Sequence, residues 1–246
     1  MALQNRKKLN KLIGKIFLPG NEKQLQHLET KLEIGSKDVL VIGTGSEEIA
    51  VYLKMKGAEF VKIIVSDYES VMNSRMILPK DTEIRVSMMD FEHTDFSAES
   101  FDLVYAQASV SSSRRNKVIK EIKRILKEGG ILNAGEITYL KSPVPIFIRE
   151  IWDAGEILPL GSNELTAYYE ERKFNIIDEI NLSDTLTDYY QKNHKLLKDK
   201  LPTLTESEKS YYKIILNRLS HESNVYLKQG GKDYIGFTSI IMRKAD

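Results

Sequence analysis

The chain has 246 residues, no cysteine, and a formal net charge of +1 from 36 basic and 35 acidic residues. This length suits one large domain or a domain with an appended lobe, and the balanced charge gives no global field that favours nucleic acid. The lack of cysteine excludes disulfides and cysteine-ligated zinc. We also find no secretory signal and no membrane-spanning run, so we expect a cytoplasmic protein that does not bind membranes.

The first twenty residues are basic and have helical periodicity. The apolar residues on one face of this segment are Leu9, Leu12, Ile13, Ile16 and Phe17. The helix either lies on a membrane surface or packs against its own domain, and we favour packing. Pro19-Gly20 ends it, and Asn21 with Gln24 resembles a capping box for a second helix over about residues 22–32.

Short apolar runs alternate with helical stretches from Asp38 onward. Strands are predicted at about 39–42, 60–67, 83–90, 101–109 and 131–139. Helical stretches lie between them, at about 47–56 and 116–127. Such an alternation predicts βαβ units and a parallel sheet.

Three features stand where predicted strands end. Gly43-Thr44-Gly45 follows the first strand, and glycine allows a ligand to approach the backbone closely. Asp67 and Asp90 end the second and third strands, where a carboxylate can accept hydrogen bonds from a ribose or an exocyclic amine. Because ligands of such sheets bind at the carboxyl ends of the strands, these features together predict an adenosine site.

The residues after the glycine turn bear on which adenosine cofactor binds. A dinucleotide-binding turn has a third glycine where Glu48 stands. Glu47 and Glu48 open the following helix and would repel a pyrophosphate. S-adenosylmethionine carries adenosine without a phosphate and therefore fits better than NAD.

Four stretches occur in the order of known family motifs. They read VLVIGTGS, VSDYES, SMMDFEHTDFSAESFDLVYAQAS and EIKRILKEGGIL. Through them, the chain from about Lys37 to Lys141 resembles the core of the class I S-adenosylmethionine-dependent methyltransferases. The resemblance implies an α/β, Rossmann-like, doubly wound and mostly parallel seven-stranded sheet with an antiparallel last strand, N-terminal helices and a helical insertion.

The resemblance also implies roles for individual residues. It places Gly43 and Gly45 at the methionine part of the cofactor, Asp67 at the ribose, Asp90 and Phe91 at the adenine, and Gln107 beside the cofactor. Thr44 and Tyr68 belong to the same expected site. The family commonly has an acid at Val41 and a glycine at Glu47, so Glu47, Glu48 or a water molecule would have to replace the missing contact to the methionine amino group.

We expect a single methyltransferase domain over residues 1–246. Its parts are an N-terminal helical lid (1–34), a cofactor-binding core (35–182), a helical substrate-side insertion (183–229) and the last strand (230–246). Such an insertion resembles a subgroup of small-molecule methyltransferases. We expect the lid and the insertion to close over the cofactor and the acceptor.

Several residues are candidates for acceptor binding and catalysis. Glu136 in the fifth strand is expected to orient a substrate amine, and Trp152 either covers the substrate or anchors the lobe. Tyr189 and Tyr190 are expected at the acceptor, and His194 is a candidate general base. The histidines lack metal-ligand spacing, so no metal is expected.

Three functions remain open at this point. The first is transfer of a methyl group from S-adenosylmethionine to a small molecule, with an amine or imidazole nitrogen preferred. The second is a regulatory protein that binds the cofactor without turnover. The third is an NAD-dependent oxidoreductase. The sequence leaves the acceptor and the oligomeric state open.

Overall fold

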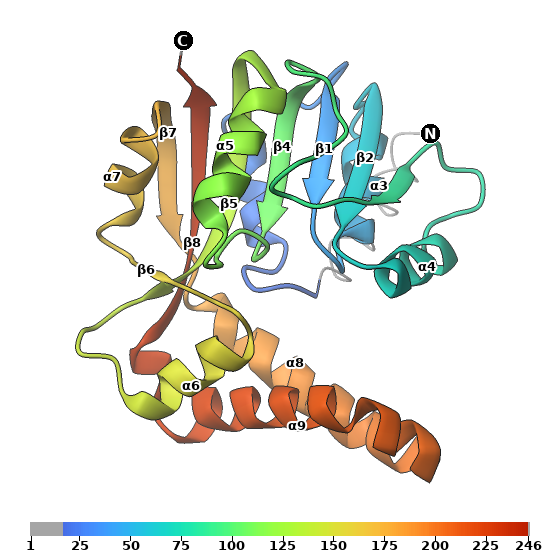
Figure 1. The fold of residues 1–246 in the computed structure, drawn as a ribbon, viewed down its shortest axis with the longest axis vertical. Helices are drawn as coiled ribbons and strands as arrows, with labels where there is room; N and C mark the ends of the chain where they lie inside the picture. Colours follow the sequence, from blue (N-terminus) through green and yellow to red (C-terminus); the bar gives the residue numbers. More distant parts are fainter. Residues whose placement is uncertain (1–16, 246) are drawn as a thin grey trace.

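The computed structural model describes residues 17–245, apart from five side chains within 208–215. It consists of a twisted sheet with helices on both faces and a helical arm below the carboxyl ends of the strands (Figure 1). Most of the apolar face expected within the first twenty residues lies outside the described range, and only Phe17 belongs to it.

The sheet has the strand order expected of a doubly wound fold. Its path is β3-β2-β1-β4-β5-β8-β7, and a short β6 pairs with β5 outside this path. β8 is antiparallel to β5 and β7, whereas the other pairs are parallel. The predicted seven-stranded path with an antiparallel last strand is confirmed. The strands are β1 (Asp38–Ile42), β2 (Phe60–Val65), β3 (Arg85–Met88), β4 (Phe101–Gln107), β5 (Leu126–Tyr139), β6 (Leu160–Gly161), β7 (Phe174–Asn181) and β8 (Ile235–Lys244).

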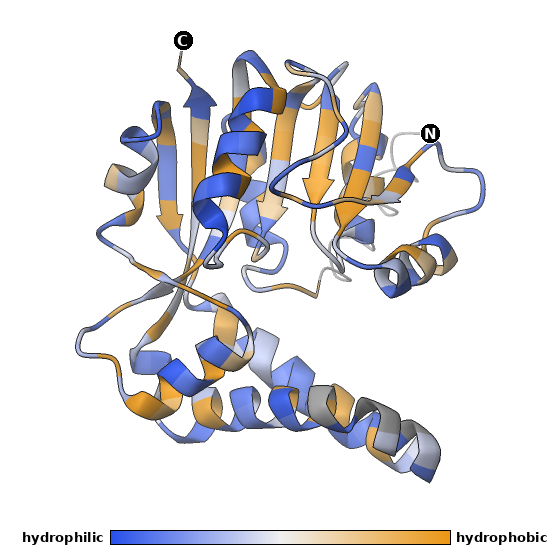
Figure 2. Ribbon diagram, in the orientation of Figure 1, coloured by the Kyte–Doolittle hydropathy of each residue, from blue (hydrophilic) through white to orange (hydrophobic). Residues whose placement is uncertain are grey.

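Helices bury an apolar layer on each face of the sheet. One layer contains residues of α2 (Lys23–Glu29), α3 (Glu47–Met55) and α4 (Tyr68–Ile77). The other contains residues of α5 (Arg115–Ile125) and α7 (Leu165–Glu170). The central strands are hydrophobic along their length, as strands covered on both faces must be (Figure 2).

The boundary between α5 and β5 differs from the prediction. The helix ends at Ile125, two residues before the predicted end, and β5 already begins at Leu126. Gly129 adopts a φ of +66°, and the β4–β5 register shifts between Phe101 and Leu103. The glycine pair therefore bends the start of a long strand and does not simply stop the helix.

The arm contains α6 (Ile146–Ala154), α8 (Thr185–Lys200) and α9 (Glu206–Lys228). A 3-10 turn, η1 (Leu201–Thr203), joins α8 to α9, and η2 (Gly231–Asp233) leads into β8. A third apolar cluster holds the base of the arm to the sheet, with residues from α6, α8, α9 and β8. No helix within residues 17–245 is both long and apolar enough to cross a membrane.

Candidate functional site

The turn after β1 takes a conformation that requires glycine. Gly43 has a φ of +115°, and a Cβ there would lie 2.8 Å from the Ser109 Cβ. Gly45 has a φ of +82°, and its nearest neighbour in that direction is Leu18. The Ser46 hydroxyl donates to the Gly43 carbonyl at 2.6 Å, just before α3 begins. The turn therefore packs against the end of β4 on one side and against the N-terminal segment on the other.

Neither Val41 nor Glu47 presents a carboxylate to this turn. Val41 is fully buried in the apolar layer. Glu47 is also buried, and its Oε1 accepts a hydrogen bond from the Ser74 hydroxyl at 2.5 Å. The Glu47 carboxylate therefore joins α3 to α4, and the structure gives it no contact with the glycine turn.

Asp67 caps α4 and remains exposed. It accepts hydrogen bonds from the Ser70 amide at 2.8 Å and from the Ser70 hydroxyl at 2.7 Å. The Ser70 backbone bond and then the hydroxyl bond lower the pKa of Asp67 below its ordinary value. A carboxylate has about four lone pairs, so acceptor sites remain for a ribose diol. Tyr68 beside it is 66% exposed, and Thr44 donates to Ser70 at 3.1 Å.

Asp90 and Phe91 line the cavities beyond β3. Asp90 is exposed, and its Oδ1 accepts from the Glu92 amide at 2.9 Å. Two adjoining cavities, about 410 and 260 Å³, share the residues Ser66, Asp90, Phe91 and Arg114. A larger hollow of about 550 Å³ lies at the opposite end of the sheet, around Asp38 and Phe60, and contains none of the expected cofactor residues. The chemistry therefore favours the carboxyl-end cavities.

Gln107 holds the N-terminal segment against the end of β4. Its amide nitrogen donates to the carbonyls of Pro19 at 2.7 Å and Asn21 at 2.9 Å. Its oxygen accepts from the Tyr105 hydroxyl at 2.7 Å. Gln107 is buried by these contacts, so it borders the expected cofactor region through the segment that it holds.

The same segment also contacts the insertion. The Gly20 amide donates to the Thr185 hydroxyl at 3.1 Å, and Asn21 Nδ2 donates to Asp188 at 3.1 Å. The Phe17 ring lies 5.6 Å from the Tyr189 ring, centroid to centroid. Residues 17–21 therefore connect the glycine turn to α8.

Two polar atoms that the sequence did not indicate lie in the segment after β4 and in the N-terminal segment. Ser109 Oγ and Asn21 Oδ1 are buried and have no hydrogen-bond partner among the described residues. Ser109 follows Ala108, whose φ is +57°, and it lines the smaller carboxyl-end cavity. The serine-rich stretch after β4 was the only sequence signal for Ser109, and none distinguished Asn21 from a capping residue.

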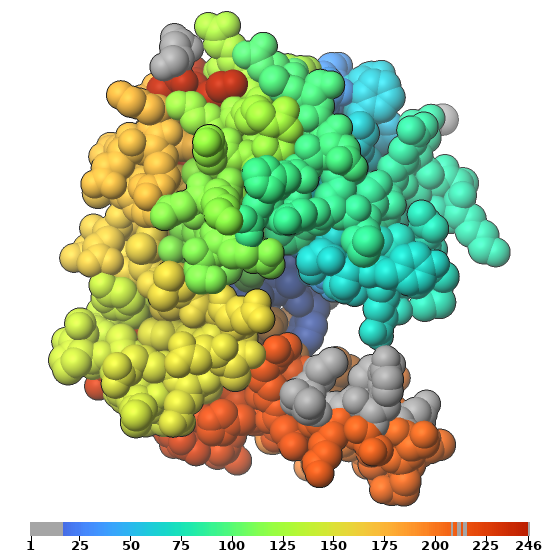
Figure 3. Space-filling view, viewed as in Figure 1, coloured from blue at the N-terminus to red at the C-terminus, as the bar shows by residue number. Residues whose placement is uncertain are grey.

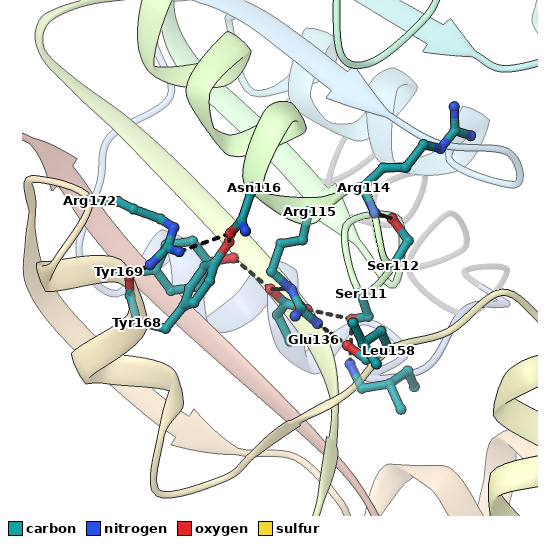
Figure 4. A network of polar contacts seen from close by, with 11 residues as sticks. Ser111, Ser112, Arg114, Arg115, Asn116, Glu136, Leu158, Tyr168, Tyr169 and Arg172 are labelled. Atoms are coloured by element: carbon teal, nitrogen blue, oxygen red, sulfur yellow. Dashed lines mark hydrogen bonds and ion pairs between the residues drawn. The ribbon is translucent and has the colours of Figure 1, made fainter.

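Glu136 lies within a buried polar network (Figure 4). It is fully buried, and its carboxylate accepts from Arg115 Nε at 3.1 Å, the Ser111 hydroxyl at 2.5 Å and the Tyr169 hydroxyl at 2.6 Å. Arg115 also donates to the Leu158 carbonyl at 2.6 Å. Burial and then the neighbouring Glu136 charge raise the pKa of Tyr169 well above its ordinary value. We expected Glu136 to orient a substrate amine. In the structure, its carboxylate accepts hydrogen bonds from protein side chains.

The candidate acceptor residues differ in their surroundings. Trp152 is buried in the apolar cluster at the base of the arm, in agreement with the anchoring alternative. Tyr190 is buried there too and stacks on Tyr226 with ring centroids 4.4 Å apart. Tyr189 is partly exposed, and burial raises its pKa, whereas His194 is exposed on α8. Tyr189 is therefore the candidate that lies beside the N-terminal segment.

No group of three histidine, aspartate or glutamate side chains in the described part of the chain could hold a metal ion. The potential cofactor contacts are instead the glycine turn, the exposed carboxylates and the unpartnered serine hydroxyl.

Known proteins share both the sequence and the fold of this region. Residues 40–134 match the family described as methyltransferase domain. The chain is 31% identical over 110 residues to the uncharacterized methyltransferase YodH of Bacillus subtilis, a match that spans 44% of this chain and 46% of YodH. The matched part is thus less than half of either protein.

Solved structures resemble nearly the whole chain. A putative sarcosine dimethylglycine methyltransferase from Galdieria sulphuraria superposes with a TM-score of 0.72 at 14% identity, over 92% of this chain and 85% of that one. Phosphoethanolamine N-methyltransferase 2 from Haemonchus contortus, in complex with phosphomonomethylethanolamine and S-adenosylhomocysteine, gives 0.72 at 14% identity, over 94% of this chain and 55% of that one. At such identities the likeness concerns the fold alone.

Proposed function

Because residues 40–134 form a class I S-adenosylmethionine-dependent methyltransferase domain, we propose that the chain transfers the methyl group of this cofactor to a small-molecule acceptor in the cytoplasm. The observation that carries the proposal is the carboxyl-end edge of the sheet. There the exposed carboxylates of Asp67 and Asp90 flank a turn that only glycine can form.

The residues at this edge fit the cofactor. Gly43 leaves backbone open where a side chain would collide with Ser109, and the Ser109 hydroxyl is a buried polar atom that lacks a partner among the described residues. Asp67 would accept bonds from the ribose hydroxyls, and Asp90 would accept one from the adenine amine. With Val41 in the core, the Ser109 hydroxyl and Asn21 Oδ1 are our candidates for contacts to the methionine end.

The bound cofactor supplies a methyl group that its sulfonium already activates. The chain has to orient the acceptor in line with that group and to exclude water. Leu18 covers the glycine turn, and the contacts of Gly20 and Asn21 with α8 bring the insertion to the same place. Figure 3 shows a hollow between α4 and the arm, with the N-terminal segment behind it. We assign acceptor binding to this hollow.

Nitrogen is the acceptor atom that we favour. Tyr189 and Phe17 place two aromatic rings where the N-terminal segment meets α8, and aromatic faces stabilise the positive charge that a nitrogen acquires on methylation. Tyr189 is the ring that we place against the acceptor. Tyr190 and Trp152 support it through the apolar cluster.

Calorimetry and a turnover screen test the proposal in two steps. We expect the protein to bind S-adenosylhomocysteine and not NAD, and then to convert S-adenosylmethionine to S-adenosylhomocysteine with members of a panel of amines, imidazoles, thiols and hydroxyl compounds. Binding of NAD instead would contradict the proposal.

A regulatory protein that binds the cofactor is the second candidate. It is favoured by Val41, which lies in the core at a position where the family commonly has an acid. Tight binding of S-adenosylhomocysteine without turnover across the whole panel would support this candidate over the enzyme.

A further inference from the structure

Glu222 of α9 carries a carboxylate that is largely shielded from solvent and has no described cation within hydrogen-bond distance. Its side chain is 16% exposed, and its one cationic neighbour among the described residues is Arg218, with Nε at 3.8 Å. This distance is too long for a hydrogen bond. Burial accordingly raises the pKa of Glu222, against the opposing effect of Arg218.

Buried glutamates in the described ion pairs have much closer cations. Lys117 lies 2.9 Å from Glu92, Arg124 lies 2.7 Å from Glu121, and Arg115 lies 3.1 Å from Glu136. A buried charge is costly unless it is paired and hydrogen-bonded. Glu222 therefore differs from these glutamates, because no cation of the described residues lies within hydrogen-bond distance of its carboxylate.

Glu222 lies on a face of α9 that contacts α6 and α8. Arg218 donates to the Ala154 carbonyl at the end of α6 at 3.4 Å, and Tyr226 stacks on Tyr190 of α8. Residues 218, 222 and 226 are one helical turn apart and share one face of the helix. This face points toward α6 and α8, which lie on the sheet side of α9 (Figure 1).

Aromatic contacts connect this part of α9 to Tyr189 of the proposed acceptor site. Tyr226, one helical turn after Glu222, stacks on Tyr190, whose ring lies 5.1 Å from the Tyr189 ring. Burial and, to a lesser extent, the Glu222 charge raise the pKa of Tyr189. Tyr189 in turn contacts Phe17, and the next residue, Leu18, packs over Gly45. The rings of Tyr226, Tyr190 and Tyr189 thus link the part of α9 that carries Glu222 to Phe17 beside the glycine turn. The neighbouring Ser223 hydroxyl is buried and has no partner among the described residues.

We propose that Glu222, with the rings of Tyr189 and Phe17, forms the subsite that binds the protonated amine of the acceptor. This inference rests on the proposed methyltransferase function and specifies its substrate class as basic amines. The carboxylate supplies the charge that pairs with the ammonium, and the rings supply cation–π contacts. The ammonium of the substrate would then supply the close cation that Glu222 lacks among the described residues.

The same carboxylate removes the proton that blocks methylation. An N–H bond of the ammonium breaks, the proton passes to a Glu222 oxygen, and the electron pair of that bond stays on nitrogen as the attacking lone pair. Burial favours the neutral carboxylic acid that results. Release of this proton to solvent after product departure restores the carboxylate.

A binding experiment with matched ligands tests the subsite. Protein loaded with S-adenosylhomocysteine is titrated with benzylamine and with its neutral analogue benzyl alcohol, and NMR gives both Kd values. We expect the wild type to prefer benzylamine by about tenfold, the ratio that a single charge-assisted contact provides. Glu222→Gln should abolish the preference. Glu206→Gln, at an exposed position of the same helix, should retain it.

A second variant should change the preference for benzylamine in the opposite direction. Arg218→Gln removes the one cation near Glu222, so the preference for benzylamine should increase. An unchanged preference in Glu222→Gln protein with a wild-type unfolding temperature would overturn the inference, and so would the lack of any preference in wild-type protein that binds S-adenosylhomocysteine. Failure of the wild type to bind S-adenosylhomocysteine would instead contradict the proposed function.

Discussion

Asp67 illustrates how one side chain at this edge serves both the fold and the proposed site. As the N-cap of α4 it accepts two hydrogen bonds from Ser70, yet it remains exposed at the end of β2. The two alternatives for this residue, a helix cap or a ribose ligand, are therefore compatible. Gly43 is the opposite case, because the lack of a side chain is what the site requires.

Asp67→Ser separates the two roles of this residue. Serine is as good an N-cap as aspartate, so we expect the thermal unfolding temperature to stay close to that of the wild type. The carboxylate is lost, so calorimetry should show S-adenosylhomocysteine binding weakened by about 1.5–3 kcal/mol, the range for hydrogen bonds to a charged group. Unchanged affinity would mean that the ribose lies elsewhere.

Gly43→Ala tests the turn itself. The new methyl group would meet the Ser109 Cβ at 2.8 Å in a backbone conformation that only glycine adopts readily. We expect a loss of about 1–3 kcal/mol in the free energy of unfolding and loss of S-adenosylhomocysteine binding. Gly129→Ala is the matched control, since Gly129 also has a positive φ but no atom near the added methyl group. Equal effects of both substitutions on binding would contradict a special role for the first turn.

Among the elements, residues 17–21 connect the cofactor-binding core to the helical insertion. This segment runs from the glycine turn to α8 and is held by Gln107 from one side and Thr185 from the other. This arrangement supports the proposal that the N-terminal region and the 183–229 insertion act together. Most of the helix expected within the first twenty residues lies outside the described part of the chain.

Thr185→Val tests the connection between this segment and the insertion. Valine keeps the shape of threonine but removes the oxygen that accepts the Gly20 amide. We expect kcat/KM for methyl transfer to fall about fivefold, which corresponds to about 1 kcal/mol for one hydrogen bond.

Thr203→Val is the control for Thr185→Val. Both hydroxyls also donate to the carbonyl three residues earlier, but Thr203 is exposed at the far end of the arm. Equal losses of activity in both variants would show that the local bond, and not the contact with Gly20, is responsible.

At the scale of the whole molecule, a buried polar contact joins α2 to the last strands. His27 Nδ1 lies 2.9 Å from the Ser239 hydroxyl, and Nε2 lies 3.3 Å from Asp178. Burial lowers the pKa of His27 below its ordinary value of 6.5, although Asp178 opposes this shift. The folded protein therefore favours the neutral imidazole.

This contact predicts a loss of stability in mild acid. The unfolded chain binds a proton at His27 more readily than the folded chain, so the free energy of unfolding should decrease as the pH falls below 6.5 toward the folded pKa. Glu222, with a raised pKa, acts in the opposite direction. Urea unfolding at several pH values should show a weaker decline for His27→Gln than for the wild type. The exposed His221→Gln should leave the decline unchanged, and an equal decline in all three proteins would contradict the prediction.

The sequence by itself determined the order of strands and helices, and it predicted the edge of the sheet at which a ligand would bind. Apolar runs such as 39–42 are buried on both faces of a parallel sheet, and the residues that end these strands must meet at one edge. Gly43, Asp67 and Asp90 could therefore be predicted from local signals as residues of the proposed site. Local patterns are reliable here because backbone conformation and strand direction depend on neighbouring residues.

Only the tertiary structure determined which side chains that are distant in the sequence contact one another. Glu136 and Gln107 were expected to lie beside ligands, and in the structure their side chains contact residues distant in the chain, such as Tyr169 and Pro19. For Trp152 the sequence left a substrate contact and an anchoring role open, and its side chain is buried in the apolar cluster at the base of the arm. Glu222 gave no signal in the sequence, since an acid on a polar helix is usually solvated. Its burial depends on how α9 packs against α6 and α8, and packing between distant elements is not encoded in the spacing of residues along one of them.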